Sequence, residues 1–329
     1  MPKLCVICGD GIGLEVVPAA VRVLQAAVPG LETVEAEAGW ECFLKRGVSV
    51  PEETLAAIRQ CGAALFGAVS SPARKVEGYR SAILTMRQAL ALYANIRPVQ
   101  SWPGISPRAG VDLIIVRENT EGLYAGRERL EGDTAIAERV ITKAASRRIA
   151  ACAVDLARSQ GRKRLTIVHK ANILPISDGL FRDQVRQVVA EFEQAGGSLQ
   201  VDEMLVDIAT YRMLSEPERF DVVVTTNLFG DILSDAAAHW CGGMGLAPSL
   251  NLGDGVALAE PVHGSAPDIA GKGIVNQMAA ILSAALLARH AWQQPEAARR
   301  IEQAVAGALA QGAGNTTDEI TAAVLRNLG

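Results

Sequence analysis

Short runs of β-branched and apolar residues alternate with longer segments of helical periodicity along the chain. The runs predict strands over residues 4–8, 63–66, 113–116, 166–169 and 222–225. The longer segments predict helices over residues 14–27, 52–60, 83–93, 135–160, 179–194, 232–241, 278–290 and 295–311. Strands joined by crossover helices form a largely parallel sheet, so the pattern predicts an α/β fold.

The chain has 329 residues, which is enough for two domains. Two stretches rich in glycine and proline, residues 97–107 and 242–255, are typical of crossings between domains. If the chain crosses at both, residues 1–97 and 250–329 form one large, discontinuous domain, and residues 98–249 form a smaller one.

Composition excludes several classes of protein. The longest apolar stretch is about ten residues, half of what a membrane-spanning helix needs. The net charge of −4 offers no general attraction to nucleic acid or anionic lipid, so we expect neither as a partner. The six cysteines lack the spacing of a disulfide framework, which indicates reduced thiols in a cytoplasmic protein. Cys5 and Cys8 have C-x-x-C spacing, but residues three apart on a strand point to opposite faces, which favours core packing over zinc.

The glycine cluster Gly9-Asp10-Gly11-Ile12-Gly13 lies between the first predicted strand and the first predicted helix. A classical dinucleotide-binding turn needs glycines at G-x-G-x-x-G and an acidic residue about 20 positions later. Here the third glycine comes one position early, and Glu32, Glu35 and Glu37 are all acidic candidates. The cluster fits a tight strand-to-helix turn better, and a classical Rossmann site is the alternative.

Four arginines are candidates for holding an anionic ligand: Arg80, Arg87, Arg97 and Arg117. Arg80, Leu84 and Arg87 share one helical face if the predicted helix extends back to Arg80. Arg117 directly follows a predicted strand, and strand ends in α/β sheets open onto ligand crevices. The planar guanidinium suits carboxylates and phosphates, whereas a solvated surface charge is the other interpretation of each arginine.

Asp231 and Asp235 lie four residues apart in a predicted helix and therefore share one face. Acidic residues at a helix start can cap it or meet its dipole, which would explain one of them. Two carboxylates on one face repel each other unless a cation lies between them. Oxygen ligands without a nearby cysteine or histidine favour Mg²⁺ or Mn²⁺.

Six motifs together resemble the β-decarboxylating dehydrogenases, the family of isocitrate, 3-isopropylmalate, homoisocitrate and tartrate dehydrogenases. The resemblance runs nearly end to end, through GDGIG (9–13), LYANIRP (92–98), RENTEGLY (117–124), KAN (170–172), TNLFGDILSD (226–235) and HGSAPDIAGKG (263–273). It implies the two-domain isocitrate/isopropylmalate dehydrogenase fold, which is not a classical Rossmann fold. The resemblance also implies that the large domain binds the cofactor and that the small domain holds the interface of a homodimer. Each active site would borrow Lys170 and Asp207 from the partner, and a tetramer stays open.

The resemblance assigns roles to residues of this sequence. Lys170 and Tyr124 would be catalytic, Lys170 by removing or relaying the hydroxyl proton and Tyr124 by protonating the enolate. Mg²⁺ or Mn²⁺ would be bound by Asp207, Asp231 and Asp235. Substrate contacts are expected from Arg80, Ser81, Leu84, Arg87, Arg97, Arg117, Tyr124, Lys170 and Asn172. Among these, Arg80 is our own inference from its spacing, and solvent exposure is the equal alternative.

The cofactor would lie on the glycine- and proline-rich loop that begins at His263. The expected contacts are His263, Gly264, Ser265, Ala266, Asp268, Ile269 and Asn276. Family members that use NADP have a basic residue and a tyrosine where this chain has Asp268 and Ile269. A carboxylate accepts hydrogen bonds from a ribose 2′-hydroxyl and repels a 2′-phosphate, so we expect NAD.

The substrate is expected to be a small 2-hydroxy polycarboxylate. Residues 37–41, 49–54 and 70–76 resemble homoisocitrate dehydrogenase of lysine biosynthesis through α-aminoadipate, so we predict oxidation of homoisocitrate to 2-oxoadipate. Isocitrate is a plausible second substrate because one methylene is discriminated by only about 1–3 kcal/mol. Leu84 would also fit 3-isopropylmalate, so 3-isopropylmalate and isocitrate dehydrogenase are the alternatives.

Two other classes of protein are alternatives. A non-catalytic regulatory subunit has little need for both Tyr124 and Lys170, which argues against it. A Mg²⁺-dependent phosphotransferase built on the first glycine cluster lacks the Gly-Lys-Ser/Thr ending of a phosphate-binding loop.

Overall fold

The computed structural model describes residues 1–74 and 76–329, which form two compact units. The first unit contains Met1–Leu92, Trp102–Ala109 and Cys241–Gly329, and the second contains Tyr93–Ser101 and Gly110–Trp240. The expected boundaries at 97/98 and 249/250 therefore differ from those between the units. Residue 97 lies inside a strand that pairs along its whole length with a strand of the second unit.

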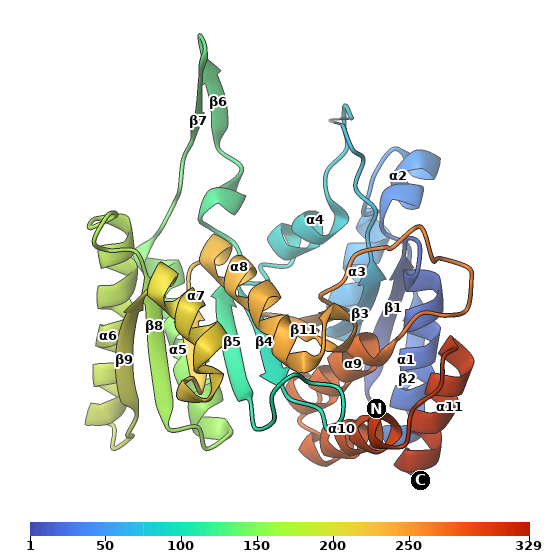
Figure 1. Cartoon of the computed structure of the whole chain (residues 1–329). Helices are drawn as coiled ribbons and strands as arrows, with labels where there is room; N and C mark the ends of the chain where they lie inside the picture. Colours follow the sequence, from blue (N-terminus) through green and yellow to red (C-terminus); the bar gives the residue numbers. More distant parts are fainter. Residues whose placement is uncertain (75) are drawn as a thin grey trace. The chain divides into compact units, whose positions relative to one another are not determined.

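The first unit contains a five-stranded sheet in the order β2-β1-β3-β12-β11. All neighbours pair in parallel except β11 and β12, which form an antiparallel hairpin. Its strands are β1 (Lys3–Gly9), β2 (Glu32–Glu35), β3 (Ala63–Ala68), β11 (Pro248–Gly253) and β12 (Val256–Pro261). Its helices are α1 (Gly13–Ala27), α2 (Trp40–Arg46), α3 (Glu52–Cys61), α4 (Ala82–Ala89), α9 (Met278–His290), α10 (Pro295–Ala310) and α11 (Thr317–Leu328) (Figure 1).

The core of the first unit lies on both faces of this sheet. Helix α9 is buried all along its length and packs against α1, α10, β11 and β12. On the other face, side chains of β1 and β3 form a cluster with α3 and α4 that includes Cys5, Ile58, Phe66 and Met86. Cys8 lies instead on the side of α1, so the two cysteines point to opposite faces as predicted.

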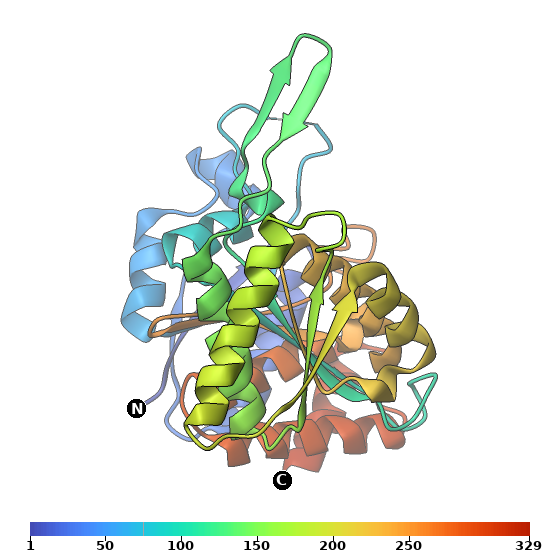
Figure 2. The ribbon, with the colours of Figure 1, turned by 90° about the vertical axis from the view of Figure 1, so that its left-hand side faces the viewer.

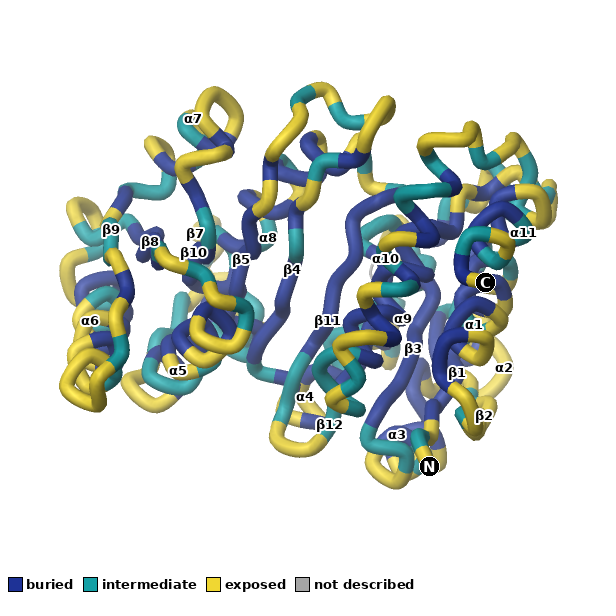
Figure 3. Tube along the Cα trace, turned by 90° about the horizontal axis from the view of Figure 1, so that it is seen from below, coloured by how far each residue is buried: buried dark blue, intermediate teal, exposed yellow. Residues whose placement is uncertain are grey.

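The second unit repeats the α/β pattern with the strand order β4-β5-β10-β8-β9. Its strands are β4 (Ala94–Gln100), β5 (Asp112–Glu118), β8 (Arg164–His169), β9 (Gln200–Leu205) and β10 (Val222–Thr225). Only β4 and β5 pair antiparallel. Helices α5 (Lys143–Ser159) and α6 (Ser177–Gln194) cover one face, and α7 (Val206–Ser215) and α8 (Asn227–Ala237) cover the other (Figure 3).

A hairpin extends from the second unit where the sequence predicted the start of a long helix. Strands β6 (Glu128–Glu131) and β7 (Thr134–Ala137) pair antiparallel and extend away from the sheet (Figure 2). The prediction of helix over residues 135–142 is wrong, because Gly132 takes a left-handed backbone conformation and turns the chain into strand pairing. Helix begins only at Lys143, where the Thr142 side chain caps it.

Other helix and strand boundaries also differ from the predicted ones. Helix α4 begins at Ala82 and ends at Ala89, so neither Arg80 nor Tyr93 belongs to it, and the expected shared helical face of Arg80, Leu84 and Arg87 does not form. Helix α8 begins at Asn227, five residues before the predicted start. The proline-containing segment around Arg97 is strand β4, because its antiparallel pairing with β5 outweighs the missing amide hydrogen of Pro98.

The first glycine cluster forms a tight turn between β1 and α1. A Cβ at Gly11, whose φ is +54°, would lie 2.3 Å from the backbone oxygen of Ser265. Next to it, the Ile12 N–H donates to that same oxygen at 2.9 Å. Glycine is therefore needed here for close packing against the 263–276 loop. Among the described residues, no helix is long and apolar enough to cross a membrane.

Candidate active site

The second unit brings two predicted arginines against the two predicted metal ligands. Arg117 lies at the carboxyl end of β5, and its Nη1 donates to Asp231 Oδ1. Arg97 of β4 donates from Nη1 to Asp235 Oδ1 at 2.7 Å. Asp231 and Asp235 share one face of α8, as predicted. Since α8 begins at Asn227, both lie beyond its first four residues, and a helix-start role does not explain them.

Arg117 is 1% exposed, and it donates hydrogen bonds from all three of its guanidinium nitrogens. Its Nε and Nη2 donate to Asn227 Oδ1 at 3.1 and 2.7 Å. Helix α8 approaches so closely that a Cβ at Gly230 would lie 2.6 Å from Arg117 Cγ. The sequence TNLFGD thus supplies a polar anchor, a glycine for close approach and the carboxylate in one turn of helix.

Arg97 has a comparable set of partners that sequence reasoning missed. Its Nε donates to Asn95 Oδ1, and its Nη1 donates to Ser234 Oγ, both at 2.7 Å. Asn95, Asn227 and Ser234 all lie inside the motifs that identified the arginines and aspartates. Their polar character next to those residues was the available signal, but their partners become evident only when β4, β5 and α8 are placed together.

Tyr124 joins this arginine–aspartate cluster from a short 3₁₀ turn at Leu123–Ala125. Its hydroxyl donates to Asp231 Oδ2 at 2.6 Å, and the Arg117 guanidinium lies 5.2 Å from its ring centroid. Burial raises the pKa of the Tyr124 phenol, and the hydrogen bond to Asp231 raises it further. The phenol is therefore protonated at neutral pH and is suited to donating a proton.

The donor set on α8 fits a hard divalent cation. The Asp231 and Asp235 side chains are 30% and 44% exposed, so neither is fully buried. Burial raises the pKa of Asp235, and the neighbouring charge of Asp231 adds to this. Such repulsion between carboxylates is what a bound cation relieves. Within residues 1–74 and 76–329, no three Asp, Glu, Cys or His side chains gather as a metal site.

Lys170 and Asp207 form a separate pair in the second unit. Lys170 follows β8, Asp207 is the second residue of α7, and Lys170 Nζ lies 2.6 Å from Asp207 Oδ1. The hydrogen bond from Lys170 lowers the pKa of Asp207 below its usual range. Asn172 is exposed in the same loop. The predicted base and the predicted third metal ligand therefore lie together on one chain.

A buried ion pair anchors the loop that carries Lys170. Asp178 is fully buried, accepts the Lys170 backbone N–H at 2.6 Å and pairs with Arg139 Nη1. Arg139 Nη2 in turn donates to the hydroxyl of Thr226 at 2.9 Å, at the start of α8. Neither Arg139 nor Asp178 was predicted, and only the fold brings these distant positions together.

We expect Asp178→Asn to lower the free energy of unfolding by about 3 kcal/mol, because it leaves the partly buried Arg139 without its counter-ion. Urea unfolding measures the effect. Asp183→Asn on the same helix α6 removes an exposed carboxylate and is the matched control. Equal effects of both variants would contradict the anchoring role.

In the first unit, Arg87 is buried near the end of α4. Its Nη2 donates to Glu260 Oε1 at 2.8 Å, and Asn251 Nδ2 donates to the same oxygen at 2.9 Å. Within the described part of the chain, the buried Arg87 Nε has no hydrogen-bond partner, which leaves a donor for a ligand. Ser81 precedes α4, Leu84 is half-buried, and Arg80 is exposed outside the helix.

The predicted cofactor loop is anchored to α1 and to the segment that follows β3. The Ser70 hydroxyl donates to Ser265 Oγ at 2.8 Å, and Glu15 accepts the N–H groups of Gly271 and Gly273 at 2.7 and 3.0 Å.

Several groups of this loop fit a dinucleotide. Asp268 and Asn276 are exposed, Ile269 is half-buried, and the Gly264 Cα faces open space. Ala266 has a φ of +38°, which shows how sharply the loop turns. Burial lowers the pKa of His263, so its ring is neutral. Among the described residues its buried Nε2 has no hydrogen-bond partner.

Comparison with known proteins places this geometry in context. The family described as isocitrate/isopropylmalate dehydrogenase matches residues 3–327. An isocitrate/homoisocitrate dehydrogenase of Thermus thermophilus is 54% identical to this chain, and the match covers 99% of this chain and 98% of the relative's length. A homoisocitrate dehydrogenase of Methanocaldococcus jannaschii is 48% identical over 87% of this chain and 84% of its own. The crystal structure of isocitrate dehydrogenase from Methylococcus capsulatus has a TM-score of 0.93 at 42% identity, covering 100% of this chain and 99% of that one.

Proposed function

Because the chain belongs to the isocitrate/isopropylmalate dehydrogenase family, we propose that it oxidises homoisocitrate to 2-oxoadipate with NAD and a divalent metal, and that it also accepts isocitrate. The observation that carries the proposal is the direct contact of Arg97, Arg117, Tyr124 and the two α8 aspartates. The names of the Thermus and Methanocaldococcus relatives support this choice of substrate.

The arginines of the cluster bind and orient the substrate. Each guanidinium already pairs with a carboxylate of α8, so the same forks are suited to the carboxylates of a polyacid. Arg87, which is held by Glu260, is proposed as a third carboxylate ligand. Asp231 and Asp235, together with Asp207 of the partner subunit, would hold a divalent ion, which would supply Lewis acidity that makes the 2-hydroxyl easier to deprotonate.

Two side chains move protons in this proposal. Lys170 Nζ, which must be in its neutral form to act as a base, accepts the proton of the 2-hydroxyl as the hydride leaves C2 for NAD. Loss of CO₂ then leaves an electron pair on C3, and the Tyr124 phenol donates its proton to that carbon.

A substrate panel tests the proposal. With NAD and Mg²⁺, we expect absorbance at 340 nm to rise with homoisocitrate and, at a lower kcat/KM, with isocitrate. 3-Isopropylmalate and tartrate complete the panel. Turnover of 3-isopropylmalate alone would replace the proposed substrate. Binding of homoisocitrate without turnover of any acid would identify a regulatory subunit instead.

Asp268→Lys is expected to shift the ratio of kcat/KM values for the two cofactors toward NADP by at least about tenfold. The Asp268 carboxylate repels the 2′-phosphate of NADP, whereas a lysine side chain attracts it. Steady-state kinetics with both cofactors measure the shift. Asp254→Lys makes the same change of charge in the exposed β11–β12 turn and is expected to leave the ratio unchanged. An unchanged ratio in the Asp268 variant would remove this residue from cofactor selection.

A variant of Arg80 tests whether this side chain binds the distal carboxylate of the substrate. We expect Arg80→Ala to lower kcat/KM for homoisocitrate about tenfold more than for 3-isopropylmalate, which has an apolar group at that position. Arg74→Ala in the same loop is the control, since Arg74 is also exposed. A uniform loss for both substrates would show that Arg80 has no selective role.

A further inference from the structure

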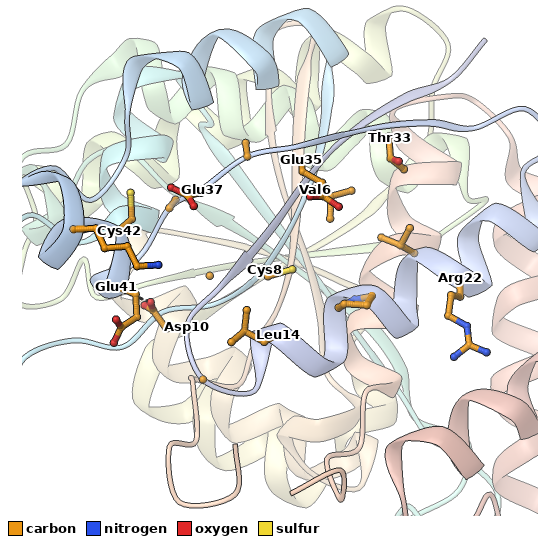
Figure 4. Close-up of a pocket in the computed structure, with 17 residues that line it drawn as sticks. Val6, Cys8, Asp10, Leu14, Arg22, Thr33, Glu35, Glu37, Glu41 and Cys42 are labelled. Carbon is orange, nitrogen blue, oxygen red and sulfur yellow. Dashed lines mark hydrogen bonds between the residues drawn. The ribbon is translucent and has the colours of Figure 1, made fainter. Parts of the chain in front are cut away.

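The first unit contains a cavity of about 500 Å³ that the proposed reaction does not use (Figure 4). It is bounded by the Gly9–Gly11 turn, α1, β2 and the start of α2. None of the described residues of the 263–276 loop lines it, so it is separate from the proposed cofactor contacts.

The position of this cavity in the fold is informative. Strands β1 and β2 are adjacent and parallel, and α1 is the crossover between them. The cavity reaches the carboxyl ends of both strands, at Cys8, Gly9 and Glu35. In nucleotide-binding α/β folds, the acidic residue that ends the second strand of such a unit binds ribose hydroxyls. Of the three acidic candidates in the sequence, Glu35 and Glu37 line the cavity and Glu32 does not.

Part of the cavity lining is apolar. This apolar wall consists of Val6 on β1, of Leu14, Pro18 and Val21 on α1, and of Ala36 and Ala38 after β2. Leu14 is 64% exposed, whereas Val6 and Ala38 are buried. A flat heterocyclic base would remove this surface from water.

The same cavity is unsuited to phosphate. Asp10 lines it, and its carboxylate accepts the N–H groups of Trp40 and Ser70, each at 2.8 Å. Glu35, Glu37 and Glu41 also line the cavity, so among the described residues its four carboxylates outnumber its two cations, Arg22 and Lys45. The Ser265 backbone oxygen lies against Gly11, at the turn where a dinucleotide fold binds pyrophosphate. Anionic groups are therefore repelled both by charge and by the packed turn.

The two thiols that line the cavity do not indicate a metal or a nucleophile. Burial raises the pKa of Cys8, and Glu35 adds to this. Burial and Glu37 likewise raise the pKa of Cys42. Both thiols are protonated at neutral pH and are therefore weak ligands for a metal ion.

We propose that this cavity binds a nucleoside without phosphate groups, of the adenosine class, with the base on the apolar wall and the ribose hydroxyls donating to Glu35. The site is independent of the proposed dehydrogenase reaction. Its occupancy is measured by binding alone, so loss of either proposal leaves the other intact.

Isothermal titration of adenosine into the full-length protein, with NAD at saturation, tests the site. We expect one adenosine per chain with NAD present, and binding at least about tenfold weaker for 2′,3′-dideoxyadenosine, which lacks the two hydroxyl donors. AMP and ATP are expected to bind more weakly than adenosine, with the difference decreasing as salt is added.

Two variants on the same strand provide the matched comparison. Glu35→Gln is expected to weaken adenosine binding at least about tenfold, because a neutral amide accepts hydroxyl hydrogen bonds less strongly than a carboxylate. Glu32→Gln makes the same change of charge on β2 outside the cavity, where Glu32 faces Lys3, and is expected to bind as wild type does. Ala36→Trp fills the cavity and should abolish binding.

Three results would overturn the proposal. The first is an absence of adenosine binding by the wild-type protein. The second is loss of binding when NAD is present, which would assign adenosine to the cofactor loop. The third is an equal effect of Glu35→Gln and Glu32→Gln, or tighter binding of AMP than of adenosine.

Discussion

A mixture of Lys170→Ala and Tyr124→Phe chains is expected to recover about a quarter of wild-type activity after subunit exchange. Each variant alone should lose activity by about 10²–10⁴-fold, the usual contribution of a proton-transfer group. The recovery follows if each site of a homodimer combines Tyr124 of its own chain with Lys170 of the partner. Random exchange makes half of the dimers mixed, and each mixed dimer has one complete site of two.

The Lys170–Asp207 ion pair determines which variants can complement each other. Because the two side chains lie 2.6 Å apart on one chain, a protomer that lends Lys170 to its partner also lends Asp207. Tyr124 instead contacts Asp231 in the arginine–aspartate cluster. A mixture of Lys170→Ala and Asp207→Ala chains has no complete site in any dimer and should stay inactive.

Initial rates after mixing, with exchange verified by mass spectrometry of tagged chains, measure the outcome. Recovery in the Lys170→Ala and Tyr124→Phe mixture together with inactivity in the other supports shared sites. Inactivity of both mixtures after verified exchange would mean that Lys170 acts within its own chain.

Arg117→Met is expected to lower kcat/KM for homoisocitrate by about 10³-fold. The variant removes a carboxylate-binding fork and leaves Asn227 Oδ1 without two of its donors. It also removes the cation over the Tyr124 ring. Arg117→Lys should recover part of the activity, because it restores the charge but not the two-pronged geometry.

Arg148→Met is the control for general destabilisation. Arg148 belongs to the same unit and lies 4.3 Å from the Tyr93 ring centroid, but it is outside the arginine–aspartate cluster. Steady-state kinetics and urea unfolding of both variants separate activity from stability. If Arg148→Met loses as much kcat/KM as Arg117→Met, the loss reflects folding and not substrate binding.

Much of the fold follows from local sequence patterns. All five predicted strands are present, because their apolar runs are buried on both faces of the two sheets and tolerate no other placement. Helix α9, predicted over residues 278–290, has those bounds in the structure. The errors fall where pairing between strands decides the outcome, as in the β6–β7 hairpin and in β4. A period-based prediction contains no information about the partner strand.

The chemistry of the candidate site could also be predicted in part. Residue types and spacing were enough to single out Arg97, Arg117, Asp231 and Asp235, because a guanidinium or a carboxylate has few uses other than binding an opposite charge. The residues that hold them were missed. Asn227, Glu260 and Asp178 have ordinary polar side chains whose roles depend on what lies opposite them.

The sequence by itself determined the α/β class, the family and the charged groups of the site, since these depend on periodicity and on side-chain chemistry, which are local properties. Only the tertiary structure decided that Arg117 and Asp231 are in contact, that Lys170 and Asp207 form a pair, and that Glu35 lines a cavity whereas Glu32 does not. These facts depend on distances between segments far apart in the chain, and such distances arise only when the strands pair and the helices pack upon them.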